Sequence, residues 1–182
     1  MADTERASES KSLEARLRDI EDRLEIYNLI ASHPPSADTG ADFYTRAVFT
    51  EDGVFDRGES LDCTLGNEAI AAITLRPAHQ EAIQGGLAHF AGLPHVELGG
   101  DTAFVTSYLQ LIHPDAGGEE RELPNHGVST GYRIHRVLAN RWELVRTPEG
   151  WKIKSRKLRP LDGSAPARDI LATALARHRP GV

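Results

Sequence analysis

Two turn signals in the second half of the chain are the strongest constraint on what it can fold into. They separate two pairs of long segments, which are 88–98 and 103–113 around Gly99-Gly100-Asp101, and 127–146 and 151–161 around Pro148-Glu149-Gly150. Glycine tolerates the positive φ that tight hairpin turns require, so both signals predict antiparallel hairpins. The Gly- and acid-rich segment 114–123 is expected to be a solvated loop between them.

The first half of the chain has helical periodicity instead. One apolar stripe follows spacings of four and three residues, and its members are Leu13, Leu17, Ile20, Leu24, Tyr27 and Ala31. This spacing predicts an amphipathic helix, and Ile26 and Ile30 widen its apolar face. The helix must end near His33, because Pro34 and Pro35 cannot continue it. Residues 36–40 are then expected to form a turn.

The remaining elements are shorter. A second helix is expected over 41–49, a turn at 51–53, strands at 54–56 and 61–64, a helix from Gly66 that stops before Pro77, and a C-terminal helix after Ser164. Helices come first and antiparallel strands follow, which is an α+β arrangement and not βαβ winding. Residues 1–11 are small and polar and are expected to be a disordered lead-in, with residues 12–182 forming a single domain.

Composition excludes several classes of function. The 21 Lys and Arg against 27 Asp and Glu give a net charge of −6, whereas nucleic-acid binding needs clustered positive charge. No apolar run is long enough to span a membrane, and the polar start is not a secretory signal, so a cytoplasmic protein is expected. Cys63 is the single cysteine, and the eight histidines lack metal-ligand spacing, so no metal is expected.

Several short motifs occur in a characteristic order. They are Ser36-Ala37-Asp38, Phe49-Thr50-Glu51-Asp52-Gly53-Val54-Phe55, Leu65-Gly66-Asn67-Glu68-Ala69-Ile70, His89, Val96-Glu97-Leu98-Gly99-Gly100-Asp101-Thr102-Ala103 and Pro148-Glu149-Gly150-Trp151-Lys152-Ile153. Their order and spacing resemble the SnoaL-like branch of the nuclear-transport-factor-two-like superfamily. The resemblance implies a cone-shaped curved antiparallel sheet wrapped around N-terminal helices, with a small-molecule site inside.

The resemblance also implies roles for four residues. His89 falls where cofactor-free eliminases of the family place a base, and Asp38 falls where its acidic partner lies. His33 and Arg156 fall at positions that bind the substrate. The residues themselves leave other interpretations open, because Asp38 fits a turn former or a helix N-cap and His89 fits a packing residue. The strand pattern does not settle which way Arg156 faces, and His79 is interpreted as a surface or structural histidine.

Two hypotheses follow. The first is a cofactor-independent lyase, of the dehydratase or dehydrohalogenase type, or an isomerase that acts on a small hydrophobic, cyclic molecule through a His89–Asp38 dyad. Its activity should rise between about pH 6 and 7, with His33 and His89 competing for Asp38. The second is a non-catalytic small-molecule-binding or accessory module of the same fold. A homo-oligomer, dimer or trimer, is expected through an apolar strand face at Val105, Leu109 and Leu111.

Overall fold

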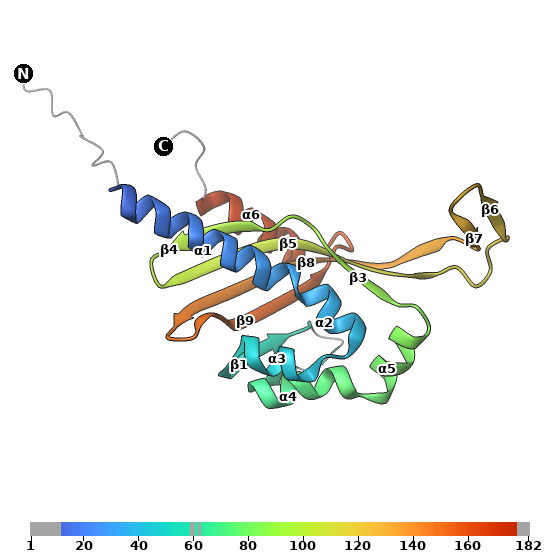
Figure 1. Ribbon diagram of the computed structural model, residues 1–182, viewed down its shortest axis with the longest axis horizontal. Helices are drawn as coiled ribbons and strands as arrows, with labels where there is room; N and C mark the ends of the chain where they lie inside the picture. The colour runs from blue at the N-terminus through green and yellow to red at the C-terminus, as the bar shows by residue number, and fades with distance from the viewer. Residues whose placement is uncertain (1–11, 59–60, 62, 178–182) are drawn as a thin grey trace, which may run out of the picture.

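A computed structural model describes residues 12–58, 61 and 63–177 of the chain (Figure 1). Its elements in order are α1 (Leu13–Ala31), α2 (His33–Thr39), α3 (Asp42–Val48), β1 (Phe49–Asp56), β2 (Thr64–Leu65), α4 (Asn67–Ala72), the 3₁₀ turn η1 (Ile73–Leu75), α5 (Pro77–Gln84), β3 (Ala88–Ala91), β4 (His95–Gly99), β5 (Thr102–Pro114), β6 (Arg121–Leu123), β7 (Gly127–Ser129), β8 (Tyr132–Thr147), β9 (Gly150–Pro160) and α6 (Ala165–Arg177). The lead-in expected at 1–11 lies outside the described residues.

The main sheet has the strand order β2-β1-β9-β8-β5-β3, and β4 also pairs with β5. Both predicted hairpin turns are confirmed, because Gly99 pairs with Thr102 and Thr147 pairs with Gly150. The fold is α+β as expected, with a curved sheet that does not close. The sheet is mixed rather than purely antiparallel, because β1 runs parallel to β9. Nothing in the local sequence distinguishes a parallel from an antiparallel partner for so short a strand.

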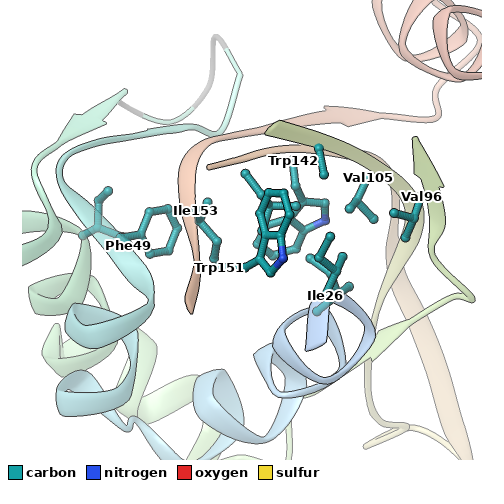
Figure 2. Packing of buried hydrophobic residues seen from close by; sticks show 11 residues of the cluster. Ile26, Phe49, Val96, Val105, Trp142, Trp151 and Ile153 are labelled. Carbon is teal, nitrogen blue, oxygen red and sulfur yellow. The ribbon is translucent and has the colours of Figure 1, made fainter. Parts of the chain in front are cut away.

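The core lies between α1 and the inner face of the sheet. Ile26 and Ile30 of α1 are almost fully buried against Val105, Trp142 and the other strand residues of this cluster (Figure 2). Burial of side chains of this size stabilises the fold by roughly 1.5–3 kcal/mol each. The inner face of the sheet therefore holds the second half of α1 in place, and α1 lies across the sheet (Figure 1).

The face that α1 buries is not the predicted stripe. Leu13, Leu17, Ile20, Leu24 and Tyr27 are between 40% and 79% exposed. The buried residues of α1 are Asp22, Ile26 and Ile30. Asp22 tolerates burial because Arg146 and Trp151, far along the chain, both donate hydrogen bonds to it. The sequence pattern could not show these distant partners.

The segment after α1 also differs from the prediction. α1 ends at Ala31 as expected, but residues 36–40 belong to α2 and do not form a turn. Pro34 and Pro35 lie in the first turn of α2, where proline costs no hydrogen bond and its fixed φ suits a helix. Pro77 likewise begins α5, a helix that the sequence analysis did not expect. Gly40, with φ of 68°, ends α2.

Expectations for several segments near the strands also need correction. Residues 51–53 lie within β1, where the pairing with β9 shifts register, and among the described residues of the strand expected at 61–64, Thr64 alone pairs with β1, together with Leu65. Segment 88–98 forms two strands, β3 and β4, since Gly92, Leu93 and Pro94 interrupt the pairing with β5. The expected loop 114–123 contains β6, which pairs with β7 in a separate hairpin. This hairpin extends beyond the ends of β5 and β8 (Figure 1).

The apolar strand face expected to mediate self-association points inward. Val105 and Leu109 are 0% and 2% exposed, because both belong to core clusters inside the chain. The opposite face of the sheet is covered by α6, whose Ala167 and Ile170 pack against Ala139 of β8. The predicted oligomer surface is therefore wrong. No helix among the described residues is long and apolar enough to cross a membrane.

Candidate active site

A cavity of about 250 Å³ lies between the short helices and the inner face of the sheet. Its walls are mostly apolar side chains from α2, α3, α4, β1, β5 and β8. His33, His89 and Arg156, three of the four candidate site residues, line it directly. Asp38 does not line the cavity but contacts His89, one of the lining residues. A small, largely apolar cavity with a few polar groups is typical of a small-molecule site.

His89 and Asp38 form a hydrogen-bonded pair. Nδ1 of His89 lies 2.6 Å from Oδ1 of Asp38. The backbone N–H of His89 also donates to both oxygens of the same carboxylate, at 3.2 and 3.0 Å. That N–H is available because β3 is an edge strand whose ladder partner, β5, lies on its other side. The carboxylate accepts from Nδ1–H, so the neutral ring carries its lone pair on Nε2.

Asp38 therefore neither caps α3, whose N-cap residue is Ala41, nor forms a turn. It lies in the last turn of α2 and binds β3 across 51 positions of sequence. The folding of Pro34 and Pro35 into α2 is what brings Asp38 to β3, since α2 packs against that strand.

His33 and Arg156 form a second contact in the same cavity. Nη1 of Arg156 lies 3.2 Å from Nδ1 of His33, and Nε donates to Oδ1 of Asn140 at 3.1 Å. Because the guanidinium only donates, Nδ1 of His33 is the acceptor and Nε2 carries the proton. Nε2 of His33 and Nη2 of Arg156 are buried without a hydrogen-bond partner among the described residues. The donors on these two atoms are thus unsatisfied.

The Arg156 guanidinium is held by aromatic rings and has no carboxylate partner among the described residues. It lies 4.0 Å from the Trp142 ring centroid and 4.8 Å from that of Phe55. Arg156 is only 2% exposed, and burial lowers its pKa well below the ordinary value of 12.5. Cation–π contacts compensate the lost hydration only in part.

Burial favours the neutral forms of His33 and His89. Burial is the main reason that the pKa of His33 lies well below 6.5, and the charge of Arg156 lowers it further. Burial also lowers the pKa of His89, although Asp38 acts in the opposite direction. His33 does not contact Asp38, so the expected competition of two imidazoles for one carboxylate is wrong. The rings of His33 and His89 lie 5.7 Å apart, edge to face.

A β-bulge decides the direction of Arg156. Glu143 pairs with Ser155 and Leu144 pairs with Ile153, so Lys154 is an extra residue in β9. The bulge reverses the alternation, and both Ile153 and Arg156 point inward although they lie three positions apart. The alternation of inward and outward residues along the sequence could not show the direction of Arg156, because it does not reveal the bulge.

Four other polar residues of the cavity region were missed. His79, Arg57 and Arg136 line it, and Asn140 supports Arg156. His79 was interpreted as a surface or structural residue, but its ring lies 6.3 Å from that of His89 and its Nε2 donates to the carbonyl of Ala37. Two signals were available, namely Pro77 as a first helical residue and the polar Asn140 within an alternating strand.

The fold is shared with known proteins. The profile of the SnoaL-like domain matches residues 18–157, which is most of the chain. The chain belongs to the SnoaL-like family. No curated protein matches the sequence.

Solved structures support the SnoaL-like assignment. An NTF2-like protein with a cystatin-like fold from Novosphingobium aromaticivorans is 36% identical, with a TM-score of 0.77, covering 87% of this chain and 94% of its own. A putative aromatic ring hydroxylase from the same organism is 26% identical, with a TM-score of 0.55, covering 78% of this chain and 90% of its own. A putative scytalone dehydratase, also from this organism, is 18% identical, with a TM-score of 0.57 and coverage of 82% and 88%.

The described part of the SnoaL-like chain contains no group of three or more His, Cys, Asp or Glu residues that could hold a metal ion. The polar groups of the cavity are instead one imidazole–carboxylate pair, a neutral imidazole and a buried guanidinium. Together they offer one proton acceptor and several hydrogen-bond donors in an apolar cavity.

Proposed function

We propose that this protein is a cofactor-independent lyase or isomerase that acts on a small hydrophobic, cyclic molecule. The observation that supports this most strongly is the pair of His89 and Asp38 at the wall of an apolar cavity. A pure carrier needs no carboxylate bound to a histidine, whereas a general base does, because the carboxylate fixes the tautomer and stabilises the imidazolium.

In the proposed mechanism His89 is the base. Its Nε2 removes a proton from a carbon of the bound molecule, and the C–H electron pair becomes a new C=C bond. In a lyase the bond to the leaving group on the next carbon breaks and the leaving group takes that electron pair. In an isomerase the new C=C bond forms toward a carbonyl carbon, and the π electron pair of the carbonyl moves onto its oxygen. The carbonyl forms again when the imidazolium of His89 returns the proton to another carbon. Asp38 stabilises the positive charge of His89 in both cases.

His33 and Arg156 are the proposed electrophilic partners. Nε2–H of His33 and Nη2–H of Arg156 are both unsatisfied and buried. Donors of this kind stabilise charge that develops on an oxygen or a departing group, and they act most strongly where water is excluded. Because the pKa of His33 is lowered mainly by burial, it donates as a neutral ring and does not compete as a base.

The pH dependence of this mechanism follows from the pKa of His89. The base is active when Nε2 is unprotonated, and burial lowers the pKa below 6.5. The acid limb of kcat/KM should therefore lie below pH 6.5, lower than the range of about 6 to 7 expected for an unperturbed histidine. A pH–rate profile of the wild type measures this directly.

Hydrogen–deuterium exchange tests the proposal without knowledge of the natural substrate. The protein is incubated in D₂O with simple cyclic ketones such as 2-tetralone, and exchange at the α-carbon is followed by NMR. The wild type should accelerate exchange, and His89→Ala should remove that acceleration. His126→Ala is the matched control, because His126 is exposed in the turn between β6 and β7. This control should exchange at the wild-type rate.

Two outcomes would contradict the proposal. Exchange that is unaffected by His89→Ala would mean that another group is the base. Binding of ketones without exchange in the wild type would favour the second hypothesis, a small-molecule-binding or accessory module with the same cavity.

A further inference from the structure

The charged side chains that line the cavity are, among the described residues, all arginines. Arg57, Arg136 and Arg156 line it, and no Asp or Glu in the described part of the chain does. This contrasts with the chain as a whole, whose net charge is −6. The nearby Asp38 accepts hydrogen bonds from His89 and is turned toward β3. Arg136 and Arg156 have no carboxylate partner among the described residues, and such cationic side chains in an apolar cavity are typical of a site for an anion.

Arg136 is placed to recognise such an anion beside the base. On the sheet, Leu111 of β5 pairs with His89 of β3 on one side and with Arg136 of β8 on the other. The three residues thus form one row across the sheet, and the Cα atoms of His89 and Arg136 are about 10 Å apart at the usual strand spacing. The half-buried Arg136 lies where β8 changes from exposed to buried residues, with no ion-pair partner among the described residues.

We propose that the ligand of this cavity is an organic anion, a ring molecule with a carboxylate that Arg136 binds while the ring lies against the apolar wall beside His89. This inference rests on the proposed function, since it concerns the substrate of the same site. Arg156 adds to the positive potential of the cavity, and its guanidinium contacts the ring of Phe55. The carboxylate selects the molecule and His89 acts on its ring or side chain.

Calorimetric titration with 2-naphthoate and its neutral isostere 2-naphthamide tests this. The wild type should bind the acid at least about ten-fold more tightly than the amide, because a hydrogen bond to a charged group contributes about 1.5–3 kcal/mol. Arg136→Gln should remove most of this preference and leave amide binding unchanged. Arg133→Gln is the matched control, because Arg133 lies on the same strand but is exposed and pairs with Asp115. This control should keep the full preference.

Each failure has a separate meaning. Equal binding of acid and amide, loss of both to the same extent in Arg136→Gln, or no binding of either would overturn the anion inference. If ketone exchange still requires His89 in that case, the proposed base stands without an anionic substrate. If the acid preference depends on Arg136 but no exchange occurs, the cavity binds anions and the proposed catalysis is wrong.

A second inference concerns the α1 seam, which consists of Leu13, Leu17, Ile20, Leu24 and Tyr27. These residues follow the alternating spacing of four and three that is typical of a coiled-coil contact, yet all are exposed. A short helix is normally marginal on its own, but Ile26 and Ile30 already fix α1 on the sheet. The seam is therefore an ordered apolar surface.

The charges beside the α1 seam indicate its partner. Arg16 and Arg23 flank one side, and Glu14 and Glu21 flank the other. In a parallel pair of α1 helices, Arg16 of one copy faces Glu21 of the other, whereas an antiparallel pair brings like charges together. We propose that a second copy of this chain packs its α1 seam against this one in parallel orientation.

Sedimentation equilibrium measures the association. The wild type should be a dimer at micromolar concentration and Leu17→Glu a monomer. Glu21→Arg should weaken the dimer, and adding Arg16→Glu to it should restore the dimer, because the pair is then reversed. Ile20→Cys in a Cys63→Ser background should form a disulfide between copies only if the helices are parallel and in register.

A monomeric wild type would overturn this second proposal, whether the seam is open or covered by residues 1–11. So would a dimer that Leu17→Glu leaves intact, or a dimer in which the reversed charges fail to restore association. Loss of the disulfide in an otherwise unchanged dimer would contradict the parallel orientation.

Discussion

Two arginines of this protein each lie on a tryptophan ring, and their surroundings differ in one respect. Arg146 lies 4.6 Å from the Trp151 ring centroid and binds two carboxylates, Asp22 at 2.5 Å and Asp101 at 2.9 Å. Arg156 lies 4.0 Å from the Trp142 ring centroid and binds the neutral side chains of Asn140 and His33. In the described part of the chain, carboxylates compensate the charge of Arg146 and none compensates that of Arg156.

The difference distinguishes a structural contact from a ligand site. The structural contact is that of Asp22 with Arg146 and Trp151, and we call it the anchor. Asp22 links α1 to β8 and β9, since Arg146 and Trp151 both donate to it. Such a network stabilises the position of α1, and its charged groups are already paired with one another within the protein. A buried cation without an anion costs folding free energy, and proteins tolerate this mainly where a function requires it. Arg156 is therefore the arginine expected to interact with a ligand.

The largest difference between the cavity and the anchor is expected in the rate of ketone exchange when Asp is replaced by Asn in each region. Asp38→Asn should lower the rate of ketone exchange by about 10²–10⁴-fold, the usual contribution of a general base. An amide NH₂ turned toward Nδ1 of His89 stabilises the tautomer whose Nε2 is protonated and cannot act as a base. Asp22→Asn should leave the rate per folded molecule unchanged. NMR measurements of ketone exchange in both variants test this. An equal loss of exchange rate in the two variants would contradict the distinction between the cavity and the anchor.

The free energy of unfolding should instead fall more in Asp22→Asn than in Asp38→Asn. Asp22→Asn should lower the free energy of unfolding by about 3 kcal/mol, because it leaves Arg146 partly buried with only the exposed Asp101 as its anionic partner. Asp38→Asn should cost less, since an amide oxygen still accepts from the backbone N–H of His89. Urea unfolding followed by circular dichroism compares the two. A larger loss at Asp38 would mean that the His89 pair is a structural element.

Replacement of Arg156 itself should have a small effect on stability. Arg156→Met loses hydrogen bonds to Asn140 and His33 but removes a buried charge that lacks an anion. The two effects oppose each other, so the free energy of unfolding should change by no more than about 1 kcal/mol. Arg146→Met, the matched variant at the anchor, should lose clearly more stability. A loss of several kcal/mol of unfolding free energy in Arg156→Met would show that Arg156 mainly stabilises the fold.

Much of the framework could be predicted from local sequence. The end of α1, the helix at 42–48 and both hairpin turns depend on Pro34, Pro35 and the glycines near them, and these signals act over a few residues. The positions of Asp38 and His89 were found through the family motifs. Their contact depends on α2, which the sequence analysis treated as a turn.

The failures involve partners that are distant in sequence. The sequence analysis placed Ile26 and Ile30 on the apolar face of α1 but missed the burial of Asp22, because Asp22 is polar and its partner Arg146 lies 124 positions away. The direction of Arg156 depends on the bulge at Lys154, which exists only when β8 and β9 pair. The parallel pairing of β1 with β9 joins the two halves of the chain. Periodicity describes each segment alone and cannot supply these contacts.

The last expected effect is a difference in pH dependence between the two regions. In the cavity, burial lowers the folded-state pKa of His33 and His89 below 6.5, so the unfolded chain binds more protons in acid. Stability must then fall as the pH drops below about 6.5. At the anchor, the hydrogen bond from Arg146 lowers the folded-state pKa of Asp22 below 3.8, so its contribution is lost only at still lower pH.

His33→Gln isolates the cavity part of this effect. Glutamine offers an oxygen to Arg156 and an NH₂ donor to the cavity but does not titrate. Between the unfolded and folded pKa of His33, the wild type should lose up to about 1.4 kcal/mol per pH unit from this residue, and the variant should lose none of it. The two unfolding free energies should therefore have a constant difference above about pH 6.5 and approach or cross below it. Urea unfolding at half-unit pH steps measures the difference, with His126→Ala as the exposed control. Parallel curves for wild type and His33→Gln would show that His33 is protonated in the folded state as readily as in the unfolded chain, and the neutral donor assigned to it in the cavity would be wrong.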